Sequence, residues 1–238
     1  MGFRDQPVDH YGRILWLRHV GLCLGSQAQY QVQLKYMKSF MKFYPGKRTF
    51  ALTFFSDLCH RTPSLVSAAD GGLATFFSSL KNENLLNDTM FITMSDHGGR
   101  FGDLRQGPQG KLEHRLPFLS VTFPSSFKSK YLEHVAGIVK NTRIITSPFD
   151  LHTTFKQLLT FPKKPSTKAV EVRHSLFEPL PFNRTCEDAG IPEQYCPCLK
   201  WQSIDISHPH VSKAARAALS YINELLVSYN MRDKLCHI

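Results

Sequence analysis

The feature that most constrains the fold is an apolar run that ends directly in two strong metal-ligand residues. The stretch TMFITMSDHGGR (Thr89–Arg100) is typical of a buried strand followed by Asp96 and His97. A carboxylate and an imidazole on one loop suit a divalent ion such as zinc or manganese. The two glycines that follow would let the backbone turn away from a crowded site. The alternative is an Asp-His-Gly turn that only caps the next element.

A second apolar run ends in the same way. The stretch RTFALTFFS (Arg48–Ser56) contains aromatic and β-branched residues and is followed by Asp57 and His60. If the two strands are neighbours, His60 and His97 would face one cleft, and Asp57 is a further candidate ligand. The alternative is that His60 is an ordinary loop residue.

Buried strands alternate with helical patterns along the chain. This alternation predicts an α/β layered fold with a mostly parallel sheet, in which ligands gather at the carboxyl ends of the strands. A Ser-Pro start predicts the beginning of one helix, at Ser147 and Pro148. The expected strands are 48–56, 89–95 and 116–124, and the expected helices are 27–44, 67–86, 147–161 and 209–229.

The chain has 238 residues, enough for one domain with an appendage. The Pro- and Lys-rich stretch FPKKPSTK marks a boundary near residue 165. We expect an irregular lead-in over 1–25, an α/β domain over 26–165, and a Cys-rich segment with a terminal amphipathic helix over 166–238.

Three of the six cysteines, Cys186, Cys196 and Cys198, crowd into one short stretch. A zinc site would need a fourth ligand and a C-x-x-C pair, whereas the close pair here is C-x-C, so disulfides are the favoured interpretation. Glycosylation sequons at Asn87 and Asn183 agree with an oxidising compartment. These features predict an extracellular or secretory-pathway location, although the first residues are too polar for a signal peptide and no apolar run reaches the roughly 18–20 residues of a membrane span.

The formal net charge is +10, but the basic residues are scattered and accompany no nucleic-acid-binding signature. A nucleic-acid binder is therefore the least favoured class. A local basic group, Lys111, His114 and Arg115, precedes the third apolar run and suits an anion such as phosphate or sulfate. The alternative is a solvated charged loop.

The stretch TMFITMSDHGGRFGDLRQGPQGKLEHRLPFLSVTFPSSF, together with CEDAGIPEQYCPC, resembles a sulfatase-like animal family, domain of unknown function 229. This family is identified as a member of the alkaline phosphatase/sulfatase superfamily. The similarity extends over roughly residues 22–200 and implies the carboxyl half of a layered metallohydrolase domain.

The resemblance implies roles for several residues. Asp96 and His97 would be paired ligands of a divalent metal (Zn, Mn or Ca), and His60 would bind a second metal or the anionic group of the substrate. Lys111 and Arg115 would be substrate-facing basic residues. The substrate class implied is an anionic phosphate or sulfate ester.

The chain also departs from the family pattern. Arg61 and His114 stand where acidic residues are expected, and both add positive charge near the expected site. No activated nucleophile can be assigned, since Cys59 is interpreted as a packing residue at the end of a strand. We therefore expect a truncated member that retains the metal-ligand loop but is inactive alone. The alternative is a non-catalytic extracellular binding or structural module.

Overall fold

The computed structural model describes residues 22–55, 58, 64–100, 102–162 and 173–236. The chain divides into two compact units, Met1–Cys198 and Leu199–Ile238. The domain boundaries expected from the sequence stay predictions.

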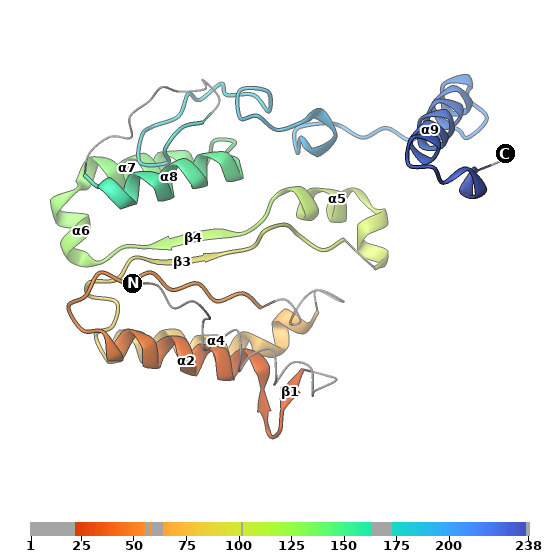
Figure 1. Ribbon diagram of the computed structural model, residues 1–238. Coiled ribbons are helices and arrows are strands. Elements are labelled where there is room, and N and C mark those ends of the chain that lie inside the picture. Colours follow the sequence, from red (N-terminus) through yellow and green to blue (C-terminus); the bar gives the residue numbers. More distant parts are fainter. Residues whose placement is uncertain (1–21, 56–57, 59–63, 101, 163–172, 237–238) are drawn as a thin grey trace. The chain divides into compact units, whose positions relative to one another are not determined.

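Two helices of the first unit, α2 (Gln29–Phe43) and α4 (Leu65–Asn82), pack against each other (Figure 1). Both helices were predicted from their apolar spacing. Their contact buries a cluster built on Leu34, Phe76 and Leu80. Gly72 lies close to Tyr30, because a Cβ at this position would be 2.3 Å from the hydroxyl oxygen of that side chain, whereas a Cβ at Gly71 would meet nothing within 4 Å.

Within the described residues there are two sheets, and each is a pair of antiparallel strands. The first sheet pairs β1 (Cys23–Leu24) with β2 (Gln27–Ala28), and the second pairs β3 (Phe91–Met94) with β4 (Leu119–Thr122). The prediction of a layered α/β fold with a mostly parallel sheet is therefore wrong. The apolar runs predicted these two strands as buried, whereas no residue of β3 or β4 is buried, and the runs carried no information about strand direction.

The expected strand over 48–56 is also not observed. Residues 48–55 form no strand, and Phe50, Leu52 and Phe54 are exposed. Phe55 alone packs against the α2–α4 cluster. The apolar composition led us to expect burial on both faces, whereas one face of this segment remains open.

Three helices follow β4: α6 (Ser125–Lys130), α7 (Leu132–Asn141) and α8 (Pro148–Thr160). The predicted start of α8 is confirmed, since Ser147 is the N-cap residue and forms a capping box with Asp150. Aromatic rings from the end of β4, from these helices and their termini, and from the segment after α8 form a second cluster, whose members include Phe123, Phe127, Tyr131, Phe161 and Phe177.

A buried ion pair fixes the segment that follows α8. Arg184 binds Asp150 through two hydrogen bonds of 2.8 and 3.0 Å, and the two side chains are only 2% and 0% exposed. The backbone N–H groups of Ser147 and His174 donate to the same carboxylate. The Ser147 hydroxyl donates a fifth hydrogen bond to Asp150, so the charge of this carboxylate is compensated although water is excluded.

The segment around residues 173–191 contains no regular element but is held by side chains of α7 and α8. Asn141 donates to the carbonyls of Leu176 and Glu178 and accepts from the N–H of Leu180. Thr154 accepts from the N–H of Leu176. These bonds satisfy backbone groups that secondary structure would otherwise satisfy.

The second unit contains α9 (Pro209–Ser228) and a short 3₁₀ helix, η3 (Arg232–Lys234). The terminal helix predicted over 209–229 is therefore confirmed. His208 caps α9 by accepting the N–H of His210, and Asn223 exchanges two hydrogen bonds with the backbone of Cys236.

We predict that Arg184→Met destabilises the protein by about 3–5 kcal/mol, because it leaves the Asp150 carboxylate buried without its partner. Urea denaturation followed by circular dichroism measures this change. The matched control is Arg143→Met, at an exposed arginine, which should change the free energy of unfolding by less than about 0.5 kcal/mol. Equal effects of the two substitutions would show that the ion pair does not stabilise this segment.

Candidate metal-binding loop

The two ends of the segment between β3 and β4 are hydrogen-bonded to each other. The N–H of Ser95 donates to the carbonyl of Phe118, and the Ser95 hydroxyl accepts from the N–H of Phe118, both at 2.9 Å. Between these residues the chain forms a 3₁₀ helix, η1 (Asp103–Gln106), and α5 (Pro108–Arg115) (Figure 1). Asp96 and His97 thus lie directly after the closed base of a long connection.

Gly98 brings this loop against the end of α5. Its N–H donates to the carbonyl of His114 at 3.3 Å. A Cβ at Gly98 would lie 2.0 Å from the carbonyl oxygen of Glu113, so only glycine fits. The glycine expected to allow a sharp turn instead allows a close approach between two backbones.

Asp96 and His97 turn toward each other. Oδ2 of Asp96 lies 3.4 Å from Nε2 of His97, while Oδ1 accepts the backbone N–H of His97. The other ring nitrogen, Nδ1, lies 2.7 Å from the carbonyl oxygen of Gly98. A carbonyl only accepts hydrogen bonds, so Nδ1 carries the proton that it donates.

The imidazole of His114 lies beside that of His97. The ring centroids are 5.9 Å apart at 67°, and Nδ1 of His114 is buried with no hydrogen-bond partner. Burial lowers the pKa of His114, and the nearby Arg105 and Arg100 lower it further. No local sequence signal places His114 against His97, because the contact joins the beginning and the end of the connection.

Arg115 lies on the last turn of α5 and contacts backbone carbonyls. Its Nε and Nη2 donate to the carbonyl of Gln194 at 3.1 and 2.8 Å, and Nη1 donates to the carbonyl of Lys111. Gln194 belongs to a 3₁₀ helix, η2 (Glu193–Tyr195). Arg115 therefore joins α5 to the Cys-rich segment, and an anion-binding role for Lys111, His114 and Arg115 stays a prediction.

Two of the expected ligands, His60 and Asp57, lie outside the described residues, as do Cys59 and Arg61. In the part of the chain that the structure describes, three cysteines form the one group of three or more potential ligand atoms that lie within 4.8 Å of one another. These are Cys186, Cys196 and Cys198, which we call the three-cysteine cluster.

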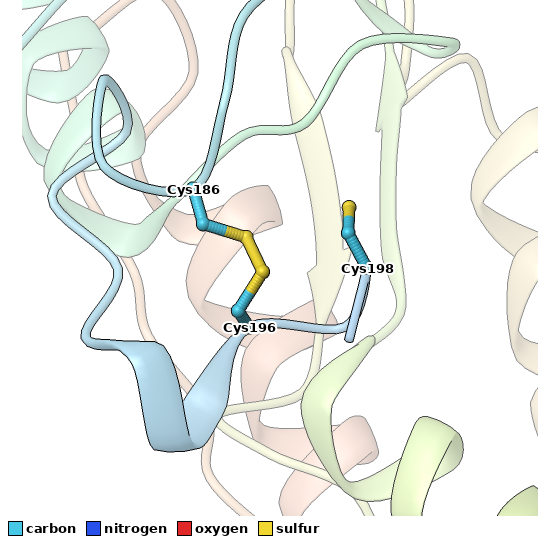
Figure 2. Close-up of side chains that lie close together, drawn as sticks. All are labelled: Cys186, Cys196 and Cys198. Atoms are coloured by element: carbon cyan, nitrogen blue, oxygen red, sulfur yellow. A yellow bond between two sulfur atoms is a disulfide. The ribbon is translucent and has the colours of Figure 1, made fainter. Parts of the chain in front are cut away.

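Figure 2 shows that two members of this cluster are already bonded. Cys186 and Cys196 form a disulfide, and Cys198 is free and exposed. The prediction of a disulfide among these residues is confirmed. The two sequon asparagines, Asn87 and Asn183, are both exposed, and their glycosylation stays a prediction.

A family model described as "Protein of unknown function (DUF229)" matches residues 1–238. The chain therefore belongs to this family, as the resemblance of its Asp-His loop and Cys-rich segment indicated. No curated protein and no solved structure matches the chain. Among the helices that the structure describes, none combines the length and apolar character needed to span a bilayer.

We predict that Gly98→Ala lowers the free energy of unfolding by about 1–3 kcal/mol, because the added Cβ forces the loop away from α5. The matched control is Gly71→Ala in α4, where a Cβ meets nothing within 4 Å. That substitution should stabilise the protein by about 0.5–1 kcal/mol. Urea denaturation measures both effects, and a stabilising Gly98→Ala would contradict the close approach.

The lowered pKa of His114 predicts a pH dependence of stability. Below its ordinary pKa of 6.5, the unfolded chain takes up a proton on this imidazole that the folded chain resists. Stability should therefore fall as the pH falls below this value, and His114→Gln should reduce the dependence. The urea midpoint of each protein is measured in EDTA at several pH values between about 4.5 and 7.5. The control is His152→Gln, at an exposed histidine, which should keep the pH dependence of the wild type. Identical slopes in the wild type and His114→Gln would contradict it.

Proposed function

We propose that the loop after β3 binds a divalent cation through Asp96 and His97. The observation that carries this proposal is the pair of atoms facing each other, Oδ2 and Nε2, at 3.4 Å. With the proton of His97 on Nδ1, both facing atoms present lone pairs. Two facing acceptors at this separation suit a divalent cation that both atoms bind.

The separation of the two atoms fits a metal ion. Two ligand atoms that each lie about 2.1 Å from a tetrahedral ion are about 3.4 Å apart. The hydrogen bond from Nδ1 to the carbonyl of Gly98 is the outer contact that orients a metal-binding imidazole. Asp96 is 58% exposed on its side chain, so solvent can supply the remaining ligands.

The class of chemistry proposed is that of a metal-dependent phosphate or sulfate ester hydrolase. A divalent cation would stabilise negative charge on an ester oxygen. The positive charges of Lys111 and Arg115 would favour an anionic substrate, whereas the lowered pKa of His114 disfavours a charged imidazole beside them. His60 remains a candidate ligand. For this chain we propose binding of the cation without ester turnover, since its sequence offers no activated nucleophile. That the chain is the carboxyl half of a longer protein stays a prediction.

A second candidate function is a non-catalytic extracellular module. The disulfide between Cys186 and Cys196 favours an oxidising compartment. The hydrolase-like candidate and the non-catalytic module share an extracellular location and the cation site. They differ in whether the bound cation takes part in ester hydrolysis.

The test of the cation site is titration with Mn²⁺, followed by electron paramagnetic resonance and calorimetry. Manganese prefers oxygen and nitrogen donors over thiols, so the three-cysteine cluster does not compete. We expect binding to fall by at least about tenfold in Asp96→Asn and in His97→Gln. The matched control is His152→Gln, on the exposed face of α8.

Equal Mn²⁺ affinity in wild type, Asp96→Asn and His97→Gln would overturn the proposed site. Each variant should retain the far-ultraviolet circular dichroism of the wild type, because both side chains lie at the surface of the loop. Turnover of an aryl phosphate or aryl sulfate by the Mn²⁺-loaded chain would contradict the absence of catalysis and favour the hydrolase.

A further inference from the structure

We propose that the three-cysteine cluster is a thiol–disulfide exchange centre in which Cys198 is the attacking thiol. The sulfur atoms of Cys186, Cys196 and Cys198 all lie within 4.8 Å of one another, and two of them form a disulfide (Figure 2). An exposed thiol this close to a disulfide has the components that exchange requires. This inference does not depend on the proposed cation site.

The distance is short enough for exchange without unfolding. A disulfide bond is about 2.0 Å long, so the Cys198 sulfur needs to move by less than about 3 Å. Rotation of a cysteine side chain from one staggered χ1 position to the next moves its sulfur by about 3 Å. A side-chain rotation, with small backbone adjustments, therefore suffices.

The backbone positions of the two bonded cysteines are fixed by neighbouring contacts. Cys186 follows the buried Arg184, and the N–H groups of Ala189 and Ile191 both donate to its carbonyl. Cys196 follows η2, whose Gln194 carbonyl binds Arg115. Cys198 lies only two residues beyond Cys196, so these contacts also keep its thiol near the disulfide.

Burial indicates which sulfur is attacked. Cys186 is half-buried, whereas Cys196 is only 7% exposed. Access decides the site of attack in thiol–disulfide exchange, so the more exposed Cys186 sulfur is the target. Attack at Cys196 would instead produce a bridge that spans Pro197 alone.

The step is redox-neutral. The Cys198 thiol loses its proton to solvent, and its thiolate forms a bond with the sulfur of Cys186. The bond between Cys186 and Cys196 breaks, and its electron pair leaves with Cys196. That thiolate then takes a proton from solvent, since burial disfavours its charged form. No oxidant or reductant is consumed.

Both products are compatible with the burial of these residues. While Cys186 is bonded to Cys196, the buried Cys196 sulfur is part of the disulfide. Once Cys186 is bonded to Cys198, the buried Cys196 is a neutral thiol. A free cysteine behaves as a small apolar group and is often buried. Exchange moves the cross-link from Cys196 to Cys198, the residue directly before the second unit begins at Leu199.

The test uses the full chain with Cys23, Cys59 and Cys236 replaced by serine, so that only the cluster remains. The protein is held at about pH 8 under nitrogen with EDTA and then alkylated, and peptide mass spectrometry without reduction locates the label. We expect label on Cys198 in one fraction of molecules and on Cys196 in another. Label on Cys198 alone, or on Cys186, would overturn the proposal.

Three variants in the same background test directly whether the Cys198 sulfur can reach Cys186. After reduction, each is reoxidised with glutathione disulfide. Cys198→Ser should form the Cys186–Cys196 disulfide, and Cys196→Ser should form Cys186–Cys198 with a yield within about tenfold of it, because the distances are similar. Cys186→Ser should instead collect mixed disulfides with glutathione.

Mixed disulfides in a folded Cys196→Ser variant would overturn the proposal, since they would show that Cys198 does not reach Cys186. Circular dichroism establishes whether this variant folds. If it does not fold, the label distribution in the three-cysteine chain decides alone, because that protein contains every residue of the cluster.

Discussion

The buried pair of Asp150 and Arg184 is the interaction on which the second half of the first unit depends. Asp150 also closes the capping box of α8, so one carboxylate starts a helix and receives an arginine 34 residues further along the chain. Removing either charge leaves the other one buried without a partner. The resulting loss in the free energy of unfolding exceeds that from losing an ordinary hydrogen bond. The irregular segment that carries the disulfide is therefore attached to a helix by a contact that tolerates little substitution.

The same segment reaches the candidate cation loop through a chain of contacts. Arg184 precedes Cys186, the disulfide joins Cys186 to Cys196, and Arg115 binds the carbonyl of Gln194. Arg115 ends α5, and its neighbour His114 lies against His97. These contacts link the paired imidazoles of the loop to the buried ion pair of Asp150 and Arg184.

The sequence predicted those features that depend on neighbouring residues. Ser147 and Pro148 marked the start of α8, apolar spacing marked α2 and α4, and crowded cysteines marked a disulfide. It did not predict that β3 and β4 are antiparallel, because their direction is decided by the hydrogen bonds that close the connection at Ser95. The partner of Asp150 and the contact between His97 and His114 join residues far apart in the chain, so no local pattern could indicate them. The membership of the chain in its family was predicted from the Asp-His loop.

The open apolar face of residues 48–55 has a consequence for the behaviour of the protein in solution. Phe50, Leu52 and Phe54 are 82%, 76% and 61% exposed and occupy alternate positions in the sequence. Exposed apolar segments rich in aromatic residues tend to associate with one another. Concentrated samples of the isolated chain should be kept from aggregating by a mild detergent rather than by salt, since added salt screens the repulsion of a chain with net charge +10 and leaves the attraction of these rings intact.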